Sequence, residues 1–239
     1  MENEEKLVYP KSDSWKMFND IAGRYDFLNR VLSLGQDTRW RRALKNFLPA
    51  TEGQVILDLA TGTADVLIAL AWRNPKIHRA FGVDPAIKML DIGLKKITAL
   101  QLDDRLILRQ GDAQALPFQD ETFDCVTIAF GIRNIPDLRL GLLEMYRVTK
   151  KHGRVLILEF SRPENPLLKA GHWLYLQLVI PAVGFLFSGN FKAYLYLTQT
   201  IQIFPPAQRF CKILKQMGFM NIQPHPLMGG AATIYVAEK

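Results

Sequence analysis

Short apolar runs alternate with longer amphipathic stretches from Gln54 to about Ser161. The runs are typical of buried strands, and the stretches between them have the apolar spacing of helices that pack on a core. Such alternation predicts successive βαβ units and a parallel sheet. The expected strands are Val55–Leu59, Arg79–Val83, Leu106–Gln110, Cys125–Ala129 and Val155–Glu159, and the expected helices are Ala64–Trp72, Ala86–Leu100 and Leu138–Thr149.

Helical periodicity also precedes and follows this region. Residues Ser12 to Leu34 have helix-compatible apolar spacing, and Asp37 is placed to cap a second helix through Trp40 and Leu44. Near the end of the chain we expect three elements, with the two strands antiparallel. They are a helix over Ala207–Met217 and strands at Asn221–Pro224 and Ala232–Ala237.

A turn with a single glycine follows the first expected strand. The segment Asp58-Leu-Ala-Thr-Gly-Thr-Ala-Asp65 places Gly62 at the carboxyl edge of the sheet, where open α/β folds bind ligands. Ala60 and Ala64 stand where a dinucleotide fingerprint has glycines, and a pyrophosphate needs several converging amides. The turn therefore favours S-adenosylmethionine over NAD, with Asp58 and Gly62 as candidate contacts. By itself it is also a common structural connection.

Two more strand ends carry acidic residues. Asp84 lies about 20 residues after the turn, where a carboxylate can accept hydrogen bonds from two ribose hydroxyls. Asp112 follows the third strand and can accept a hydrogen bond from an adenine amine, while a neighbouring amide binds a ring nitrogen. Three strand ends are expected to converge on one nucleoside. The structural alternatives are a helix cap at Asp84 and a turn at Asp112.

Composition narrows the classes of protein. The 239 residues are 49% apolar and 22% charged, which is ordinary for one globular domain. Cys125 and Cys211 lie in apolar runs and are expected to be reduced, and the four histidines lack metal-ligand spacing, so we expect no metal site. The polar N-terminus lacks the pattern of a secretory signal, which indicates a cytoplasmic protein.

Charge is uneven along a chain whose formal net charge is +7. Between Glu164 and Glu238 there are five cations and no acid, which would attract an anionic membrane surface or a nucleic acid; a solvated helix face is the alternative. Trp173–Phe187 is the most apolar stretch, but its 15 residues are fewer than the about 20 of a bilayer span. It is predicted to be a lid over an apolar ligand, or else an ordinary buried helix.

Two long motifs resemble the C-methyltransferases of ubiquinone and menaquinone biosynthesis, over nearly the whole chain. The first is Tyr25-Asp-Phe-Leu-Asn-Arg-Val-Leu-Ser-Leu-Gly-Gln-Asp-Thr-Arg-Trp40, and the second is Arg147-Val-Thr-Lys-Lys-His-Gly-Arg-Val-Leu-Ile-Leu-Glu-Phe-Ser161. Phe130-Gly-Ile-Arg-Asn134 also matches the family's pattern. Asp37 and His152 depart from it, at positions where relatives have His and Gly.

The resemblance implies a Rossmann-like class I methyltransferase with a seven-stranded, mostly parallel sheet and helices on both faces. It implies that Thr63, Asp84, Asp112 and Ala113 contact S-adenosylmethionine, and that the substrate is a prenylated quinol. We expect demethylmenaquinol, with a methoxy-benzoquinol of the ubiquinone branch as the alternative. Beyond that quinol, an anionic membrane and a homodimer are kept open as partners, and no nucleic acid is expected.

An aromatic carbon accepts a methyl group readily when a neighbouring hydroxyl has lost its proton. Arg133 and Asn134 follow the fourth strand at the ligand edge, where they could stabilise a phenolate and orient its hydroxyl. An ion pair of Arg133 with Asp137 is the alternative. Tyr25 and Asp26 are further candidates, either for lining the pocket or for assisting removal of the proton. Another small-molecule methyltransferase, an NAD-linked oxidoreductase and a non-catalytic membrane protein are the competing functions.

Four parts are expected within one domain. These are an N-terminal helical cap over 1–52, a cofactor-binding core over 53–161, an apolar lid or substrate insertion over 162–204, and a C-terminal helix with closing strands over 205–239.

Overall fold

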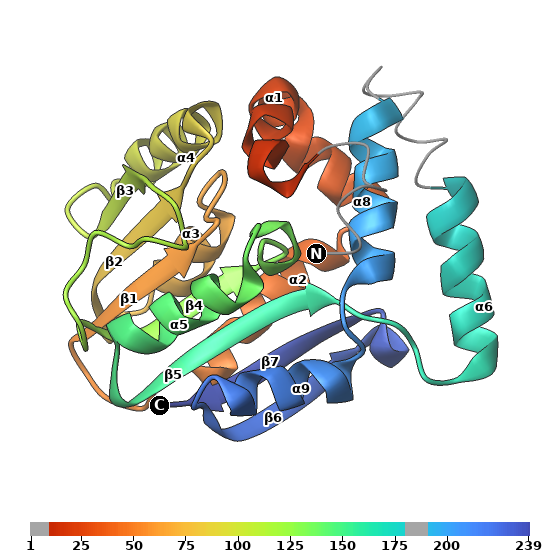
Figure 1. Ribbon diagram of the computed structural model, residues 1–239. Coiled ribbons are helices and arrows are strands. Elements are labelled where there is room, and N and C mark those ends of the chain that lie inside the picture. Colours follow the sequence, from red (N-terminus) through yellow and green to blue (C-terminus); the bar gives the residue numbers. More distant parts are fainter. Residues whose placement is uncertain (1–9, 180–190) are drawn as a thin grey trace.

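A seven-stranded sheet organises the computed structural model, which describes residues 10–179 and 191–239 (Figure 1). The strand order is β3-β2-β1-β4-β5-β7-β6, parallel from β3 to β5, with β7 antiparallel to both β5 and β6. This confirms the predicted fold class. The strands are β1 Gln54–Leu59, β2 Ile77–Asp84, β3 Leu106–Gln110, β4 Phe123–Ala129, β5 Thr149–Phe160, β6 Met220–Leu227 and β7 Ala232–Glu238.

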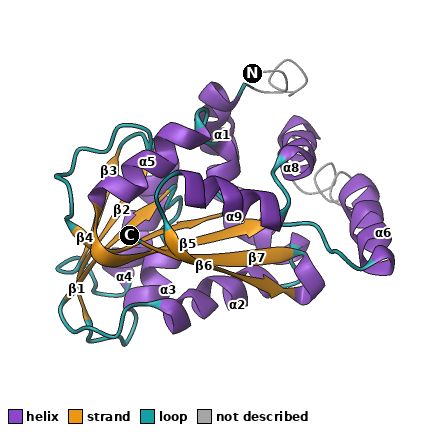
Figure 2. Cartoon of the chain, turned by 60° about the horizontal axis from the view of Figure 1, so that its bottom comes forward, coloured by secondary structure: helices purple, strands orange, loops and turns teal. Residues whose placement is uncertain are grey.

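Helices cover both faces of the sheet (Figure 2). On one face lie α2 (Gln36–Ala43), α3 (Asp65–Ala71) and α4 (Ile87–Ala99), and on the other lie α5 (Leu138–Val148) and α9 (Ala207–Gln216). Side chains of β1 alternate between two apolar clusters, because successive residues of a strand point to opposite faces. Ile56 packs in the α3 cluster, and Leu57 packs in the α5 cluster.

Three helices lie beside the carboxyl edge of the sheet rather than on its faces (Figure 1). Helix α1 (Ser14–Leu32) packs against α8 (Phe191–Ile203) through a separate apolar cluster that includes Met17, Leu28 and Tyr196. Helix α6 (Pro166–Leu174) stands away from the sheet in both views and continues into a π-helical turn, Tyr175–Val179. Within residues 10–179 and 191–239, no helix is long and apolar enough to cross a membrane.

Most predicted elements are present, and two boundaries differ by more than two residues. Strand β5 begins at Thr149 rather than Val155, and β6 extends to Leu227. Of the apolar stretch Trp173–Phe187, the residues from 180 onward lie outside the described part. Both cysteines are free, and only Cys125 is fully buried.

The prediction that Asp37 caps a helix is wrong. Helix α2 begins one residue earlier, after Gly35, whose φ of 76° lies in the left-handed region that favours glycine. The Asp37 carboxylate instead accepts hydrogen bonds from the side chains of Arg30 and Arg41. A nearby pair of guanidinium groups offers a charged carboxylate stronger bonds than neutral backbone amides do.

Candidate active site

Two adjoining cavities open at the carboxyl edge of the parallel strands. The first, of about 230 Å³, lies over the ends of β1, β2 and β3, and we call it the strand-end cavity. The second, of about 350 Å³, lies between α1, α2 and α8, and we call it the apolar cavity. Phe18, Tyr25 and Phe130 line both, so these three rings form the boundary between the cavities.

Four of the predicted cofactor residues line the strand-end cavity: Gly62, Asp84, Asp112 and Ala113. The φ of Gly62 is 54°, and an added Cβ would meet the Met89 methyl group at 3.3 Å. A side chain at this position would therefore fill space at the cavity wall. Asp112 is exposed, and its carboxylate accepts hydrogen bonds from the amide side chain of Gln114 at 3.0 and 3.1 Å.

Asp84 joins two neighbouring loops through its carboxylate. One oxygen accepts the Gly62 N–H at 2.9 Å, and the other accepts the Ala86 N–H at 2.8 Å. Burial raises the pKa of Asp84 to about 6, and these two hydrogen bonds limit the rise. Asp84 does not cap α4, whose N-cap is Ala86. Each carboxylate oxygen retains a further lone pair for a ligand.

Non-glycine residues adopt left-handed backbone conformations around this cavity. The φ angles are 48° at Ala60, 63° at Ala64 and 57° at Phe130. Such conformations cost on the order of 1 kcal/mol for residues with a Cβ, and they are concentrated at functional sites. Ala60 and Phe130 both line the strand-end cavity, so the strained backbone is part of its wall.

The two other predicted cofactor residues, Asp58 and Thr63, line neither cavity. The Asp58 side chain is buried within the sheet and accepts a hydrogen bond from the Thr127 hydroxyl at 2.6 Å. Burial raises its pKa to about 7, and Thr127 opposes the rise. The Thr63 hydroxyl donates to Asp26 of α1 at 2.7 Å. In this structure the side chains of both residues form hydrogen bonds to other protein groups and do not face either cavity.

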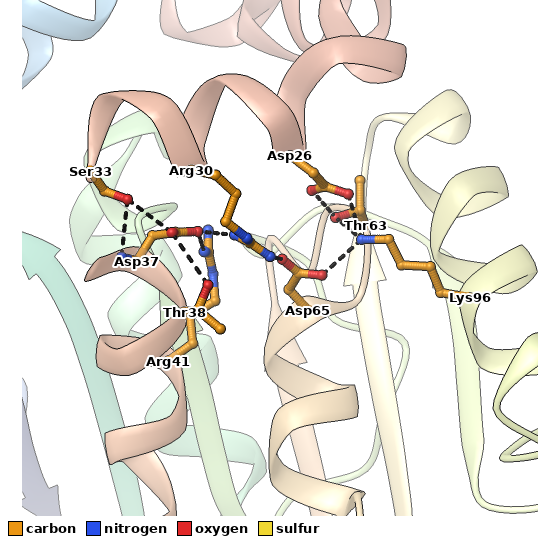
Figure 3. A network of polar contacts seen from close by, with 9 residues as sticks. All are labelled: Asp26, Arg30, Ser33, Asp37, Thr38, Arg41, Thr63, Asp65 and Lys96. Carbon is orange, nitrogen blue, oxygen red and sulfur yellow. Dashed lines mark hydrogen bonds and ion pairs between the residues drawn. The ribbon is translucent and has the colours of Figure 1, made fainter. Parts of the chain in front are cut away.

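A network of six charged groups joins α1 and α2 to the core (Figure 3). At one end, Lys96 of α4 lies 2.5 Å from an Asp26 oxygen and 2.7 Å from an Asp65 oxygen. Arg30 continues it by binding the second Asp65 oxygen at 2.8 Å and also the carboxylate of Asp37. Arg41 binds the same carboxylate of Asp37, which completes the network.

Three carboxylates and three cations make this network neutral. Burial alone would raise the pKa of Asp65, but Lys96 and Arg30 outweigh it and lower that pKa. Because the folded-state pKa lies below the unfolded value, the resulting stabilisation is present above about pH 4 and is lost as pH falls. This network was not predicted from the sequence. Only the number of charged residues within the first family motif indicated that ion pairs form there.

Arg133 lies in the wall of the apolar cavity, beside two aromatic rings that contact each other at a tilt. The ring centroids of Phe130 and Phe160 are 4.5 Å apart, and the Arg133 guanidinium lies 5.3 Å from the centre of the Phe160 ring. Its Nη1 atom donates to Glu159 at 2.7 Å and to the Phe130 carbonyl at 2.6 Å. Complete burial raises the pKa of Glu159, and the Arg133 charge opposes that rise.

The predicted alternative partner of Arg133 is wrong, because Asp137 instead caps α5 by accepting the Arg139 and Leu140 amides. Asn134 lines the strand-end cavity, whereas Arg133 lines the apolar cavity. These consecutive residues therefore stand on either side of the boundary that Tyr25 also lines. Both residues were predicted from the sequence, whereas Glu159 and the α8 residues that contact the pair were not.

The chain is similar to known proteins over most of its length. The sequence model of the ubiE/COQ5 methyltransferase family matches residues 6–239. The chain belongs to this family. It is 44% identical to the ubiquinone/menaquinone biosynthesis C-methyltransferase UbiE of Geotalea uraniireducens, over 98% of this chain and 99% of that protein. It is 40% identical to the demethylmenaquinone methyltransferase of Bacteroides fragilis, over 94% of this chain and 91% of that protein.

Solved structures share the fold at lower identity. A SAM-dependent methyltransferase from Aquifex aeolicus superposes with a TM-score of 0.55 at 17% identity, covering 83% of this chain and 88% of that one. The phosphoethanolamine N-methyltransferase 2 of Haemonchus contortus, solved with S-adenosyl-L-methionine, superposes with a TM-score of 0.61 at 18% identity. It covers 82% of this chain and 51% of that one. Both similarities concern the fold.

Replacing Lys96 by Met should destabilise the protein by about 1–2 kcal/mol, because Asp26 and Asp65 lose their shared cation in a partly buried place. The free energy of unfolding in urea measures this. Lys76→Met is the matched control, since Lys76 pairs with Glu52 in an exposed place and should change stability by less than about 0.5 kcal/mol. Equal effects of the two substitutions would contradict a structural role for the network.

Proposed function

We propose that this chain transfers the methyl group of S-adenosylmethionine to a ring carbon of a prenylated quinol, most specifically demethylmenaquinol. The observation that carries the proposal is the meeting of the two cavities at Tyr25 and Phe130, with Arg133 on one side and Asn134 on the other. A methyl donor and an apolar acceptor need such adjoining sites. The names of the family's similar members support the same chemistry.

The strand-end cavity fits S-adenosylmethionine by the chemistry of its groups. Asp84 has lone pairs for the ribose hydroxyls, while Asp112 and the Ala113 amide line the same cavity and would bind adenine. Gly62 leaves room for the methionyl part, and the φ of Ala64 turns the chain into α3. The bound cofactor would supply a methyl group on a positively charged sulfur. The chain's own residues must align the acceptor carbon with it.

Arg133 and Asn134 would stabilise the negative oxygen of the acceptor ring. A guanidinium offers only N–H donors and no acceptor, so Arg133 would act through its charge rather than by removing a proton. Glu159 and the Phe130 carbonyl hold Nη1, and within the described residues no hydrogen bond engages Nη2. Preorganised donors of this kind act at a cavity wall that holds little water. Tyr25 would lie against the ring at the boundary of the cavities.

The apolar cavity would hold the ring and the start of the prenyl tail. Leu34 and Met228 are exposed residues that also line it, and Gly171 and Tyr175 extend its wall to α6 and the turn after it. The tail would leave between these elements. We therefore assign 1–52 as the cap, 53–161 as the cofactor core, 162–204 as the substrate insertion and 205–239 as the closing part of the sheet.

We further propose that α6 contacts the inner face of an anionic membrane. Its described side chains are all exposed, including Leu167, Leu168 and Trp173, so the helix presents apolar side chains at the surface. Lys169 lies among them, and no acid occurs between Glu164 and Glu238. Apolar side chains with interspersed cations are typical of helices that lie in a membrane interface. A quinol with a long tail would reach the cavity from this surface.

An activity assay tests the function. With labelled S-adenosylmethionine, the protein should methylate demethylmenaquinol, and Arg133→Lys should lower kcat about 100-fold or more while cofactor binding is retained. The ammonium group of this variant keeps a positive charge near Glu159, but it lacks the further N–H groups with which the guanidinium can bind a second acceptor. Faster methylation of a methoxy-benzoquinol would favour the ubiquinone branch, and transfer to neither quinol would overturn the proposal.

Affinity for S-adenosylmethionine should fall about tenfold from pH 7 to pH 5, because the Asp84 pKa is about 6 and the ribose needs the ionised carboxylate. Calorimetric titrations at several pH values measure this. Asp84→Asn should weaken binding at pH 7 and abolish the slope. Asp120→Asn, at an exposed loop acid paired with Arg147, should keep the slope. An unchanged slope in Asp84→Asn would count against the assignment.

The protein should bind vesicles rich in phosphatidylglycerol, less tightly as salt rises. Lys169→Glu should reduce binding about tenfold, because it reverses one charge on α6, and Trp173→Ser should reduce it by loss of apolar contact. Both positions are exposed, so folding should be unaffected. Lys88→Glu on α4 is the control of equal charge change. Failure to bind at low salt, or equal losses in the control, would refute the membrane assignment.

A further inference from the structure

Two side chains of α8, one helical turn apart, hold the side chains of Arg133 and Asn134. The Tyr196 hydroxyl lies 3.2 Å from Asn134 Oδ1, and Arg133 Nε donates to the Thr200 hydroxyl at 3.3 Å. The Thr200 hydroxyl in turn donates to the Tyr196 carbonyl at 2.9 Å. All three contacts are formed by buried residues of α8, which is distant in sequence from the turn after β4.

We propose that Tyr196 is a positioning residue that makes Asn134 a hydrogen-bond donor toward the acceptor ring. This rests on the proposed quinol methylation, in which Asn134 would stabilise the negative ring oxygen, and it names the residue that orients the amide for that role. With Oδ1 engaged by the Tyr196 hydroxyl, the Nδ2 group is the end directed to a ligand. Asn134 then donates to the negative oxygen, as Arg133 does, and accepts no proton.

The surroundings keep the Tyr196 hydroxyl a donor. Its side chain is 1% exposed, and burial raises its pKa, with Arg133 opposing the rise, so the hydroxyl is protonated at neutral pH. The Tyr196 hydroxyl therefore donates its proton to Asn134 Oδ1, and the orientation of the amide depends on α8.

The kinetic test combines Tyr196→Phe with Asn134→Ala. Tyr196→Phe keeps the ring and removes only the hydroxyl, so the Asn134 amide can rotate; kcat should fall about tenfold, while the quinol KM and the cofactor affinity change less than twofold. In the Asn134→Ala background, Tyr196→Phe should have no further effect, because it acts through that amide. Tyr235→Phe removes another buried hydroxyl, one outside both cavities, and should leave kcat unchanged.

Two results would overturn the positioning role while leaving the function intact: an unchanged kcat in Tyr196→Phe, or the same tenfold loss in both backgrounds. A measurement independent of activity separates the two proposals. The side-chain amide resonances of Asn134, observed by NMR in the cofactor-bound protein, should shift and broaden in Tyr196→Phe and stay unchanged in Tyr235→Phe. Unchanged resonances in Tyr196→Phe would overturn the positioning role even for a protein that methylates no quinol.

Discussion

The ion network between Lys96 and Arg41 is the interaction on which both cavities depend. Helix α1 supplies Phe18 and Tyr25 to the boundary of the cavities, yet it lies at the edge of the sheet and not on its main apolar faces. Charge pairing between α1, α2, α3 and α4 holds it there (Figure 3). Because such pairs lose much of their hydration, a neutral and fully bonded network is needed to offset the cost.

The buried ion pair of Arg133 and Glu159 fixes a group of the site rather than the position of a helix. Glu159 at the end of β5 takes one edge of the Arg133 guanidinium, and Thr200 takes its Nε atom. The guanidinium is thereby fixed before any ligand arrives, which is the condition for electrostatic stabilisation without reorganisation. Glu159 belongs to the second family motif, Arg147–Ser161. Its role is to anchor a cation.

Local pattern predicted much of this protein, because its central strands β1, β4 and β5 are largely buried and its candidate ligand residues follow strand ends. Asp84, Asp112 and Gly62 could be placed at one edge of the sheet because each follows the end of an expected strand, and all three line the strand-end cavity. Thr63 and Asp58 look equivalent to them in sequence, but their side chains point away from the cavity, and only the three-dimensional course of the turn decides that. The contribution of Tyr196 could not be predicted, since helical periodicity does not reveal which distant loop a helix will meet.

The position of α8 links the two halves of the proposed reaction. It lines the apolar cavity with Tyr196 and Ile201, and the same helix bonds to the residues that would stabilise charge. The exposed helix α6 precedes it in the chain. A segment that binds an apolar substrate and also orients the groups that act on it makes chemistry depend on occupancy of the cavity. Binding energy from the tail can then contribute to the alignment of the ring, which is how contacts remote from the reacting carbon lower a barrier.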